Sequence, residues 1–199
     1  MNLTISKQQL KYIACAVSND SHRKAIQKAA LMDLDGSLWC VSTDTYRIHA
    51  VKLGSAQGQA VVALDTKRAL IELAFHKLPD LRIGEGETPG QSVQQAFDCS
   101  AKNISRSETI FHPLLSDFDG KFPDIEKVIP KWEDLSGGNV CGAAFNFSYI
   151  TDGSQMARTA AYRVVMMGQS DSRPWVILPR KCKPTECEWF TVIMPMSLV

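Results

Sequence analysis

A three-residue pattern that occurs three times constrains the fold of this chain more than any other feature. An apolar residue is followed by a helix-capping side chain and by the first residue of a helix: Ile5-Ser6-Lys7, Leu64-Asp65-Thr66 and Phe145-Asn146-Phe147. Ser, Asp and Asn side chains accept hydrogen bonds from the free N–H groups at a helix start, so each copy predicts a strand that leads directly into a helix. Recurrence of this kind is typical of a repeated supersecondary unit.

The residues around each copy predict one strand, one helix and three further strands. Apolar residues recur after Ser6 at the spacing of one helix face: Leu10, Ile13, Ala14 and Val17. Asp35-Gly36 is a hairpin signal between two strand-like runs. In the first unit we expect a helix from residue 7 and strands over 1–5, 24–34, 38–43 and 46–53.

The second and third units follow the same order. In the second we expect a helix over 66–77 and strands over 60–64, 81–83, 96–100 and 109–115. In the third we expect a helix over 147–160, weakened by Gly153, and strands over 140–145, 162–167, 175–178 and 188–196.

A stretch with two prolines, residues 121–130, separates the second unit from the third. Pro123 and Pro130 fix φ and disfavour helical geometry in the residues that precede them. Ile125, Val128 and Ile129 lie between the prolines, and such apolar residues are uncommon in a solvated linker. We therefore expect an extended connector that packs into a seam between two parts of the protein.

Composition and charge are those of an ordinary soluble globular chain. Of the 199 residues, 45% are hydrophobic and 22% charged, and the net charge is +1. We find no apolar run of membrane-spanning length and no signal peptide at the N-terminus. The small net charge means that any contact with DNA depends on local positive charge.

The six cysteines are scattered, with no Cys-x-x-Cys pair. Cys15, Cys40 and Cys141 lie in apolar contexts, which favours reduced thiols and a cytoplasmic protein over a disulfide framework. Cys182 and Cys187 lie in a loop, where half of a metal site remains an alternative, although no histidine is near them.

No catalytic motif is present. The sequence lacks a glycine-rich phosphate loop, a His-Glu-x-x-His motif and a Gly-x-Ser-x-Gly elbow, and its four histidines are far apart. Asp33 and Asp35 lie at a hairpin turn, where solvated carboxylates are usual. We therefore predict a protein that is not an enzyme and has no cofactor and no metal.

Three segments in this order resemble the bacterial sliding clamp family, the β subunit of DNA polymerase III. They are Val41-Ser42-Thr43-Asp44-Thr45-Tyr46-Arg47-Ile48, the connector Asp119–Pro130 and Thr191-Val192-Ile193-Met194-Pro195-Met196-Ser197-Leu198. The family has Thr-Asp-Gly-His-Arg-Leu, Phe-Pro-Asp-x-x-x-Val-Leu-Pro and Val-Met-Pro-Met-Arg-Leu at the corresponding places. This chain departs from the family at Thr45-Tyr46 and at Ser197.

The resemblance implies an α+β DNA clamp fold of repeated β-α-β-β-β units, with sheets outside and helices lining a ring. Residues 1–121 correspond to the middle domain of the family, 122–137 to the connector, and 138–199 to the second half of the last domain. The first domain and the front half of the last one have no counterpart in this chain.

In the family these segments line a groove that captures short peptide tails. The resemblance carries this role to Thr43, Thr45, Tyr46, Arg47, Ile48, Pro123, Val128, Val192, Met194, Pro195, Met196 and Leu198. Flexible methionines beside a rigid proline also suit an adaptable apolar peptide site. The alternative is that Val192, Met194 and Met196 alternate as the buried face of a strand.

Family helices present basic residues to DNA phosphates, which gives binding independent of sequence. The resemblance implies this role for Lys7, Lys11, Arg23, Lys24, Lys67, Arg68, Lys77 and Arg158. The alternative is that these side chains are only solvated.

The family ring contains twelve units, so a chain with three units would close it as a homotetramer, with the open strand edges paired head to tail. The leading hypothesis is a bacterial cytoplasmic sliding clamp, a processivity factor that encircles duplex DNA and binds polymerase and clamp-loader peptides. The runner-up is a clamp-like module that binds such peptides as a regulator without encircling DNA.

Overall fold

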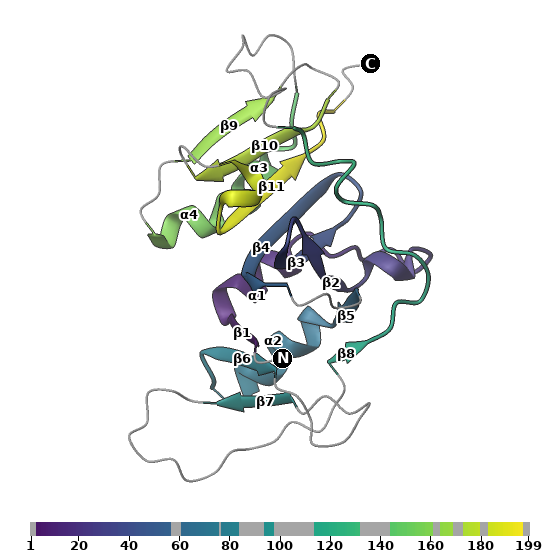
Figure 1. The fold of residues 1–199 in the computed structure, drawn as a ribbon, viewed down its shortest axis with the longest axis vertical. Helices are drawn as coiled ribbons and strands as arrows, with labels where there is room; N and C mark the ends of the chain where they lie inside the picture. Colours follow the sequence, from purple (N-terminus) through teal and green to yellow (C-terminus); the bar gives the residue numbers. More distant parts are fainter. Residues whose placement is uncertain are drawn as a thin grey trace.

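The computed structural model describes residues 3–56, 61–75, 77–83, 94–97, 114–131, 144–160, 164–168, 173–179 and 183–196. The chain is a mixed α+β protein built from antiparallel strands and short helices (Figure 1). No helix in these ranges is long and apolar enough to cross a membrane.

The first unit contains one helix and four strands, with a 3-10 turn between the helix and the second strand. Its elements are β1 (Leu3–Ser6), α1 (Lys7–Ala14), η1 (Lys24–Ile26), β2 (Ala29–Leu34), β3 (Ser37–Thr43) and β4 (Arg47–Ser55). Ser6 caps α1 as predicted: its Oγ accepts from Gln9 N at 3.2 Å, and Gln9 Oε1 accepts from Ser6 N at 2.8 Å. This reciprocal capping fixes the point at which the strand becomes a helix.

The second and third units repeat this order. The second has β5 (Val62–Leu64), α2 (Thr66–Phe75), β6 (Asp80–Ile83), β7 (Gln94–Phe97) and β8 (Leu115–Ser116). The third has α3 (Phe147–Gly153), α4 (Gln155–Ala160), β9 (Val164–Gly168), β10 (Trp175–Pro179), η3 (Pro184–Glu186) and β11 (Trp189–Ile193). Of the strand predicted over 140–145, only residues 144 and 145 are described: Ala144 forms an isolated bridge with Met196, and Phe145 is not in a strand.

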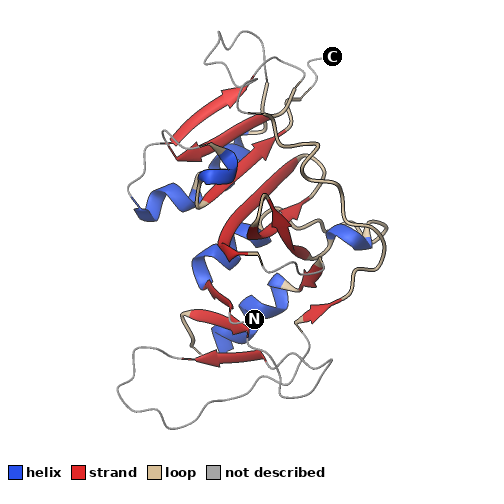
Figure 2. Ribbon diagram, viewed as in Figure 1, coloured by secondary structure: helices blue, strands red, loops and turns tan. Residues whose placement is uncertain are grey.

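The strands of the described ranges form two sheets, drawn in red in Figure 2. The larger has the order β8-β5-β2-β3-β4-β11-β10-β9 and the smaller β1-β6-β7. Strand β4 of the first unit pairs with β11 of the third in the register Ile48↔Val192. Units far apart in the sequence are therefore joined by one continuous ladder.

The first two units exchange their first strands. Strand β1 pairs with β6, the strand that follows the helix of the second unit, and β5 pairs with β2, the strand that follows the helix of the first. Each unit thus completes the sheet of the other. This exchange makes the two units mutually dependent.

The larger sheet separates two apolar cores. On one face α1, α2 and α4 contribute buried residues such as Leu10, Leu73 and Ala157. On the other face the connector buries Phe122 and Ile125 among residues of both the first and the third units. In Figure 1 the connector runs along the side of the molecule away from α1 and α4. The packing of the connector across the seam is therefore confirmed.

Several predicted boundaries are wrong in detail. Residues Lys24–Ile26 form a 3-10 turn, so β2 starts later than expected. Helix α2 ends at Phe75 and leaves Lys77 in a turn with a positive φ of 56°. The connector is not fully extended, because the N–H groups of Val128 and Ile129 both donate to Ile125 O. The helix predicted over 147–160 breaks at Ser154 into α3 and α4.

Gly153, at the end of α3, is required by close packing. A Cβ there would lie 2.9 Å from Thr191 Cγ2 and 3.0 Å from Thr191 Oγ1. The sequence predicted only that this glycine weakens a helix. The structure shows that it lets α3 lie directly against β11.

We expect Gly153→Ala to lower the free energy of unfolding by about 1–3 kcal/mol through overpacking. At an exposed helical position the same change would stabilise the helix by about 1 kcal/mol, so the sign distinguishes the two cases. Denaturant unfolding measures it. Thr191→Ser removes the nearest clashing methyl group, so Gly153→Ala should cost less in that background. Stabilisation of the wild-type chain by Gly153→Ala would contradict the close contact.

Candidate functional site

The turn between β3 and β4 is fixed by its own polar side chains. Thr43 Oγ1 donates to Arg47 O at 2.8 Å and accepts from Thr45 N at 3.0 Å. Asp44 Oδ1 accepts from Tyr46 N at 3.0 Å and from Arg47 N at 3.1 Å. Thr45 has a positive φ of 82°. This turn holds the Tyr46 side chain outward with 58% of its surface exposed.

Arg47, the first residue of β4, links the first unit to the third. Its Nε donates to Asp44 Oδ2 at 3.0 Å and its Nη1 to Asp152 Oδ2 of α3 at 2.6 Å. Its Nη2 donates to the carbonyl oxygen of Cys15, after α1. Only 10% of the side chain is exposed. Burial alone lowers the pKa of Arg47, but the Asp152 and Asp44 carboxylates outweigh it and raise that pKa above its ordinary value.

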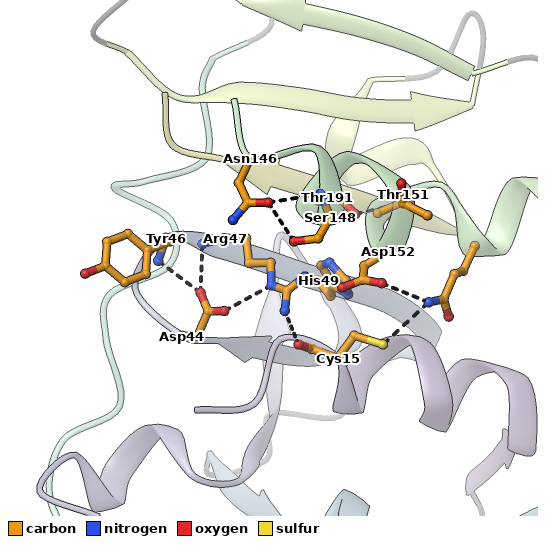
Figure 3. A network of polar contacts seen from close by, with 12 residues as sticks. Cys15, Asp44, Tyr46, Arg47, His49, Asn146, Ser148, Thr151, Asp152 and Thr191 are labelled. Atoms are coloured by element: carbon orange, nitrogen blue, oxygen red, sulfur yellow. Dashed lines mark hydrogen bonds and ion pairs between the residues drawn. The ribbon is translucent and has the colours of Figure 1, made fainter. Parts of the chain in front are cut away.

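The guanidinium of Arg47 also lies over the Tyr149 ring, 4.4 Å from its centroid, in a cation–π contact. Figure 3 shows Asp44, Arg47, Cys15 and Asp152 in one network, while the Tyr46 ring points away from it. The Arg47 network therefore fixes α3 against the turn that carries Tyr46.

The residues after β11 lie beside the Tyr46 turn, where the first unit meets the third. Met194 N donates to Tyr46 O at 2.8 Å, and Met196 N donates to Ala144 O at 2.7 Å. Met194 and Pro195 are half-buried, and Met196 is 52% exposed. The backbone of this segment is thus tied down, while apolar side chains reach the surface beside Tyr46.

The residues expected to line a groove fall into two layers. Thr43, Ile48 and Val192 are buried at 4%, 4% and 1% exposure, so they support the surface from beneath. Tyr46 and Met196 are exposed above them, and Val128 is half-buried against the core under the connector. Leu198 lies outside the described residues.

The structure adds three residues that sequence reasoning did not assign to this site. Asn146, Phe147 and Tyr149 come from the start of α3, and Phe147 is 78% exposed. Asn146 Oδ1 accepts from Ser148 N at 3.0 Å, which caps α3. The capping pattern found Asn146 but could not show that the helix start lies beside the Tyr46 turn.

A hollow of about 630 Å³ lies next to the Tyr46 turn. It is lined by Ser21, His22, Arg23, Lys24, Ala25, Ile26, Thr45, Asp119, Lys121 and Pro123. Arg23 Nη1 donates to Thr45 Oγ1 at 3.0 Å. Arg23 also pairs with Asp20 at 3.4 Å, and Lys24 pairs with Asp119 at 3.1 Å. Arg23 and Lys24, which follow α1 in the sequence, therefore lie beside the turn and the connector.

Four of the predicted DNA-contacting residues lie on two neighbouring helices. Lys7 and Lys11 are on α1, Lys67 and Arg68 are on α2, and the two helices pack against each other. Lys67 Nζ donates to Asn19 Oδ1.

The other helix residues fit the expected basic face less well. Helix α2 also exposes Ile71 at 67% and Phe75 at 79%. Lys77 is not on a helix, as described above. Arg158 is on α4, and its side chain lies outside the described part of the structure.

The described residues contain no group of three or more His, Cys, Asp or Glu side chains that could hold a metal ion. Cys187 is buried, and its Sγ donates to Lys183 O at 2.9 Å. Cys182, its predicted partner in a half site, lies outside the described residues.

Solved structures with the same arrangement are those of bacterial DNA polymerase III beta subunits. The subunit from Thermotoga maritima superposes with a TM-score of 0.63 at 13% identity, over 100% of this chain and 66% of that one. The chain has the sliding-clamp fold. The subunit from Pseudomonas aeruginosa gives 0.63 at 18% identity, over 100% of this chain and 67% of that one.

A third structure, the sliding clamp from Bartonella birtlesii bound to griselimycin, gives a TM-score of 0.61 at 17% identity over 99% of this chain and 66% of that one. The chain thus spans about two thirds of the length of these clamps. No protein-family model matches the sequence, and no curated protein matches it. The fold inferred from the three segments is confirmed.

Proposed function

We propose that this protein is a non-catalytic clamp-type tether of the bacterial cytoplasm, which captures short apolar peptide tails of DNA polymerases and clamp loaders. The observation that carries the proposal is an apolar surface at the joint between the first and third units. This joint surface consists of Tyr46, Phe147, Met194, Pro195 and Met196. Tyr46, Phe147 and Met196 are more than half exposed, and large apolar side chains exposed to this extent are candidate contacts for a partner.

The chemistry of the joint surface suits a peptide ligand. Met194 and Met196 have flexible side chains that adapt to different apolar partners, while Pro195 and the tied backbone keep them in place. The Arg47 network fixes the Tyr46 turn relative to α3. Peptide binding therefore costs little conformational entropy of the protein. The basic hollow beside Thr45 suits an acidic residue next to the apolar anchor.

Griselimycin, which is bound in the Bartonella birtlesii clamp, is a suitable probe of the joint surface. We expect it to bind, and we expect Met194→Ala with Met196→Ala to weaken binding at least about tenfold, as truncation of interface anchors does. Isothermal titration calorimetry measures the change.

Ile71→Ala is the matched control, because Ile71 is an exposed apolar residue on α2, outside the joint surface. It should leave the affinity unchanged. Unchanged affinity in the double methionine variant would show that the joint surface is not the binding site.

A second candidate function is encirclement of duplex DNA by a ring of this chain, for which a homotetramer is the proposed assembly. Lys7, Lys11, Lys67 and Arg68 favour it, because basic residues on neighbouring helices suit contacts to phosphates. Exposed Ile71 and Phe75 on the same α2 helix do not favour it.

Changing the four basic residues to alanine should shorten retention on nicked circular DNA and lower the salt dependence of binding. The joint surface should still bind griselimycin in this variant. A wild-type protein that is not retained on circular DNA at low salt would exclude encirclement and would leave the peptide proposal standing.

A further inference from the structure

Thr45, in the turn that carries Tyr46, has a backbone conformation that β-branched residues rarely adopt. Its φ of 82° lies in the left-handed region, which glycine occupies without strain. Strained backbone of this kind persists only where surrounding contacts fix it, and it is concentrated at ligand-binding sites. The contacts of Thr45 therefore indicate what this turn holds in place.

The side chain of Thr45 accepts a hydrogen bond from a cation. Arg23 Nη1 donates to Thr45 Oγ1 at 3.0 Å, and Nε of the same guanidinium lies 3.4 Å from Asp20 Oδ2. A glycine at position 45 would relieve the strain, but it would remove the acceptor for Arg23. The strained turn therefore holds the Arg23 guanidinium at a fixed place next to the joint surface.

Arg23 belongs to a loop that its own hydrogen bonds keep in shape. Asp20 N donates to Ser18 Oγ at 3.1 Å, and Asp20 Oδ1 accepts from His22 N at 2.9 Å. Gln27 Nε2 donates to Asp20 O at 3.0 Å. Because the loop and the guanidinium are already ordered, a ligand that binds there costs the protein little conformational entropy.

The hollow of about 630 Å³ beside the turn contains two cations that can still bind an anion. Among the described residues, Nη2 of Arg23 has no partner, since the contacts of this guanidinium are made by Nη1 and Nε. Lys121 also lines the hollow and forms no ion pair within the described ranges. Lys24 pairs with Asp119 at 3.1 Å, so these two charges offset each other.

We propose that Arg23 is the charge anchor of the joint surface, which binds a carboxylate of the captured peptide in this hollow. The proposal rests on the proposed function, because the apolar side chains of the same peptide occupy the joint surface. The planar N–H donors of a guanidinium suit a carboxylate, and Thr45 acts through Arg23 as a positioning residue. A peptide is favoured over nucleic acid because Arg23 is bonded to the turn that carries Tyr46.

Isothermal titration calorimetry with synthetic hexapeptides tests the charge anchor. Each peptide ends in Leu-Phe, has serine elsewhere and is blocked at both ends. One series carries a single Asp at each serine position in turn, and a matched series carries Asn there. A further peptide without Asp has a free C-terminal carboxylate, which distinguishes the two sources of the charge. We expect one charged peptide to bind about fivefold more tightly than its neutral counterpart, as a partly exposed charge pair allows.

The gain in affinity, measured as the ratio of charged to neutral peptide within each variant, should depend on Arg23 and Thr45. Arg23→Gln should abolish it. Thr45→Gly relieves the strained φ, so it should not lower the thermal midpoint, yet it should reduce the gain because the guanidinium is no longer held. A merely structural Thr45 would not give this combination. Lys183→Gln is the matched control, because it removes the same charge from an exposed side chain outside the hollow, and it should keep the gain.

Equal affinity of the wild type for charged and neutral peptides would overturn the charge anchor, and so would a gain that survives Arg23→Gln. If the wild type gains nothing from a carboxylate but binds inorganic phosphate through Arg23, nucleic acid is the ligand of the hollow instead. Thermal unfolding shows whether Arg23→Gln is folded; if it is not, Thr45→Gly decides alone. Griselimycin binding is measured on the same preparations. Its presence without a carboxylate gain refutes only the charge anchor, whereas absence of all binding refutes the proposed function and the anchor with it.

Discussion

Replacing Arg47 by alanine is expected to lower the free energy of unfolding by about 3 kcal/mol, because it leaves two partly buried carboxylates without their cation. Asp44 and Asp152 have side chains only 18% and 29% exposed, and both bond to this guanidinium. The carbonyl oxygen of Cys15 and the Tyr149 ring lose their partner as well. For a chain of this length the thermal midpoint should fall by about 6–12 °C.

The same substitution should weaken griselimycin binding although Arg47 is almost buried. The bond from Arg47 to Asp152 connects α3 with the Tyr46 turn. When Arg47 is replaced by alanine this connection is lost, so the two sides of the joint surface lose their fixed spacing. Thermal unfolding and calorimetric titration of one preparation measure both effects.

Arg47→Lys is the conservative control. A lysine keeps the positive charge but cannot bond to Asp44, Asp152 and Cys15 in one plane, so it should recover only part of the loss. An Arg47→Ala protein that melts within about 2 °C of the wild type would show that the network contributes little to stability.

The local chemistry of the chain could be predicted well from the sequence. Ser6 and Asn146 cap helices as expected, and Asp35-Gly36 forms the turn between β2 and β3 with positive φ values at both residues. These features depend on neighbours within a few residues, for which the side-chain chemistry is decisive. The connector was also predictable as a buried segment, since its apolar residues had to pack somewhere.

Features that depend on distant residues could not be predicted in this way. From the sequence alone, Gly153 predicts only a weakened helix, whereas the structure shows that Thr191 lies directly against it. In the sequence, Arg23 is one of several basic residues near a helix. In the structure it donates a hydrogen bond to Thr45 of the Tyr46 turn. Both contacts form only when segments of one unit that are far apart in the sequence come together in the fold. The resemblance to the clamp family supplied the positions of the turn and of the methionines, but not the part of α3 in the joint surface.

A buried polar cluster next to the joint surface gives stability a pH dependence. His49 is completely buried and stacks on the Tyr12 ring, with centroids 4.4 Å apart. Its Nδ1 lies 2.6 Å from Tyr12 O, so this nitrogen carries the proton and donates to the carbonyl. Its Nε2 is buried without a hydrogen-bond partner among the described residues. The Tyr12 hydroxyl donates to Phe190 O at 2.8 Å, which ties the cluster to β11.

Acidification should therefore destabilise the protein between about pH 6.5 and pH 4. Burial lowers the pKa of His49 to about 4, the bond to Tyr12 O opposes this shift, and the charge of Arg47 adds to it. Because the ordinary pKa near 6.5 applies in the unfolded chain, the unfolded state binds more protons in this window and stability falls with pH. The expected loss is about 2 kcal/mol at pH 5, compared with neutral pH.

His49→Gln keeps a donor for Tyr12 O and removes the titrating group, so it separates this contribution from that of the carboxylates. Its free energy of unfolding, measured by urea denaturation, should depend less on pH between 6.5 and 4 than that of the wild type. Both proteins retain Asp44, Asp152 and Arg47, so the difference between their pH profiles belongs to His49. Parallel profiles would mean that His49 has the same pKa in the folded and in the unfolded protein. In that case the buried environment of Nε2 would not disfavour the charged imidazolium as proposed.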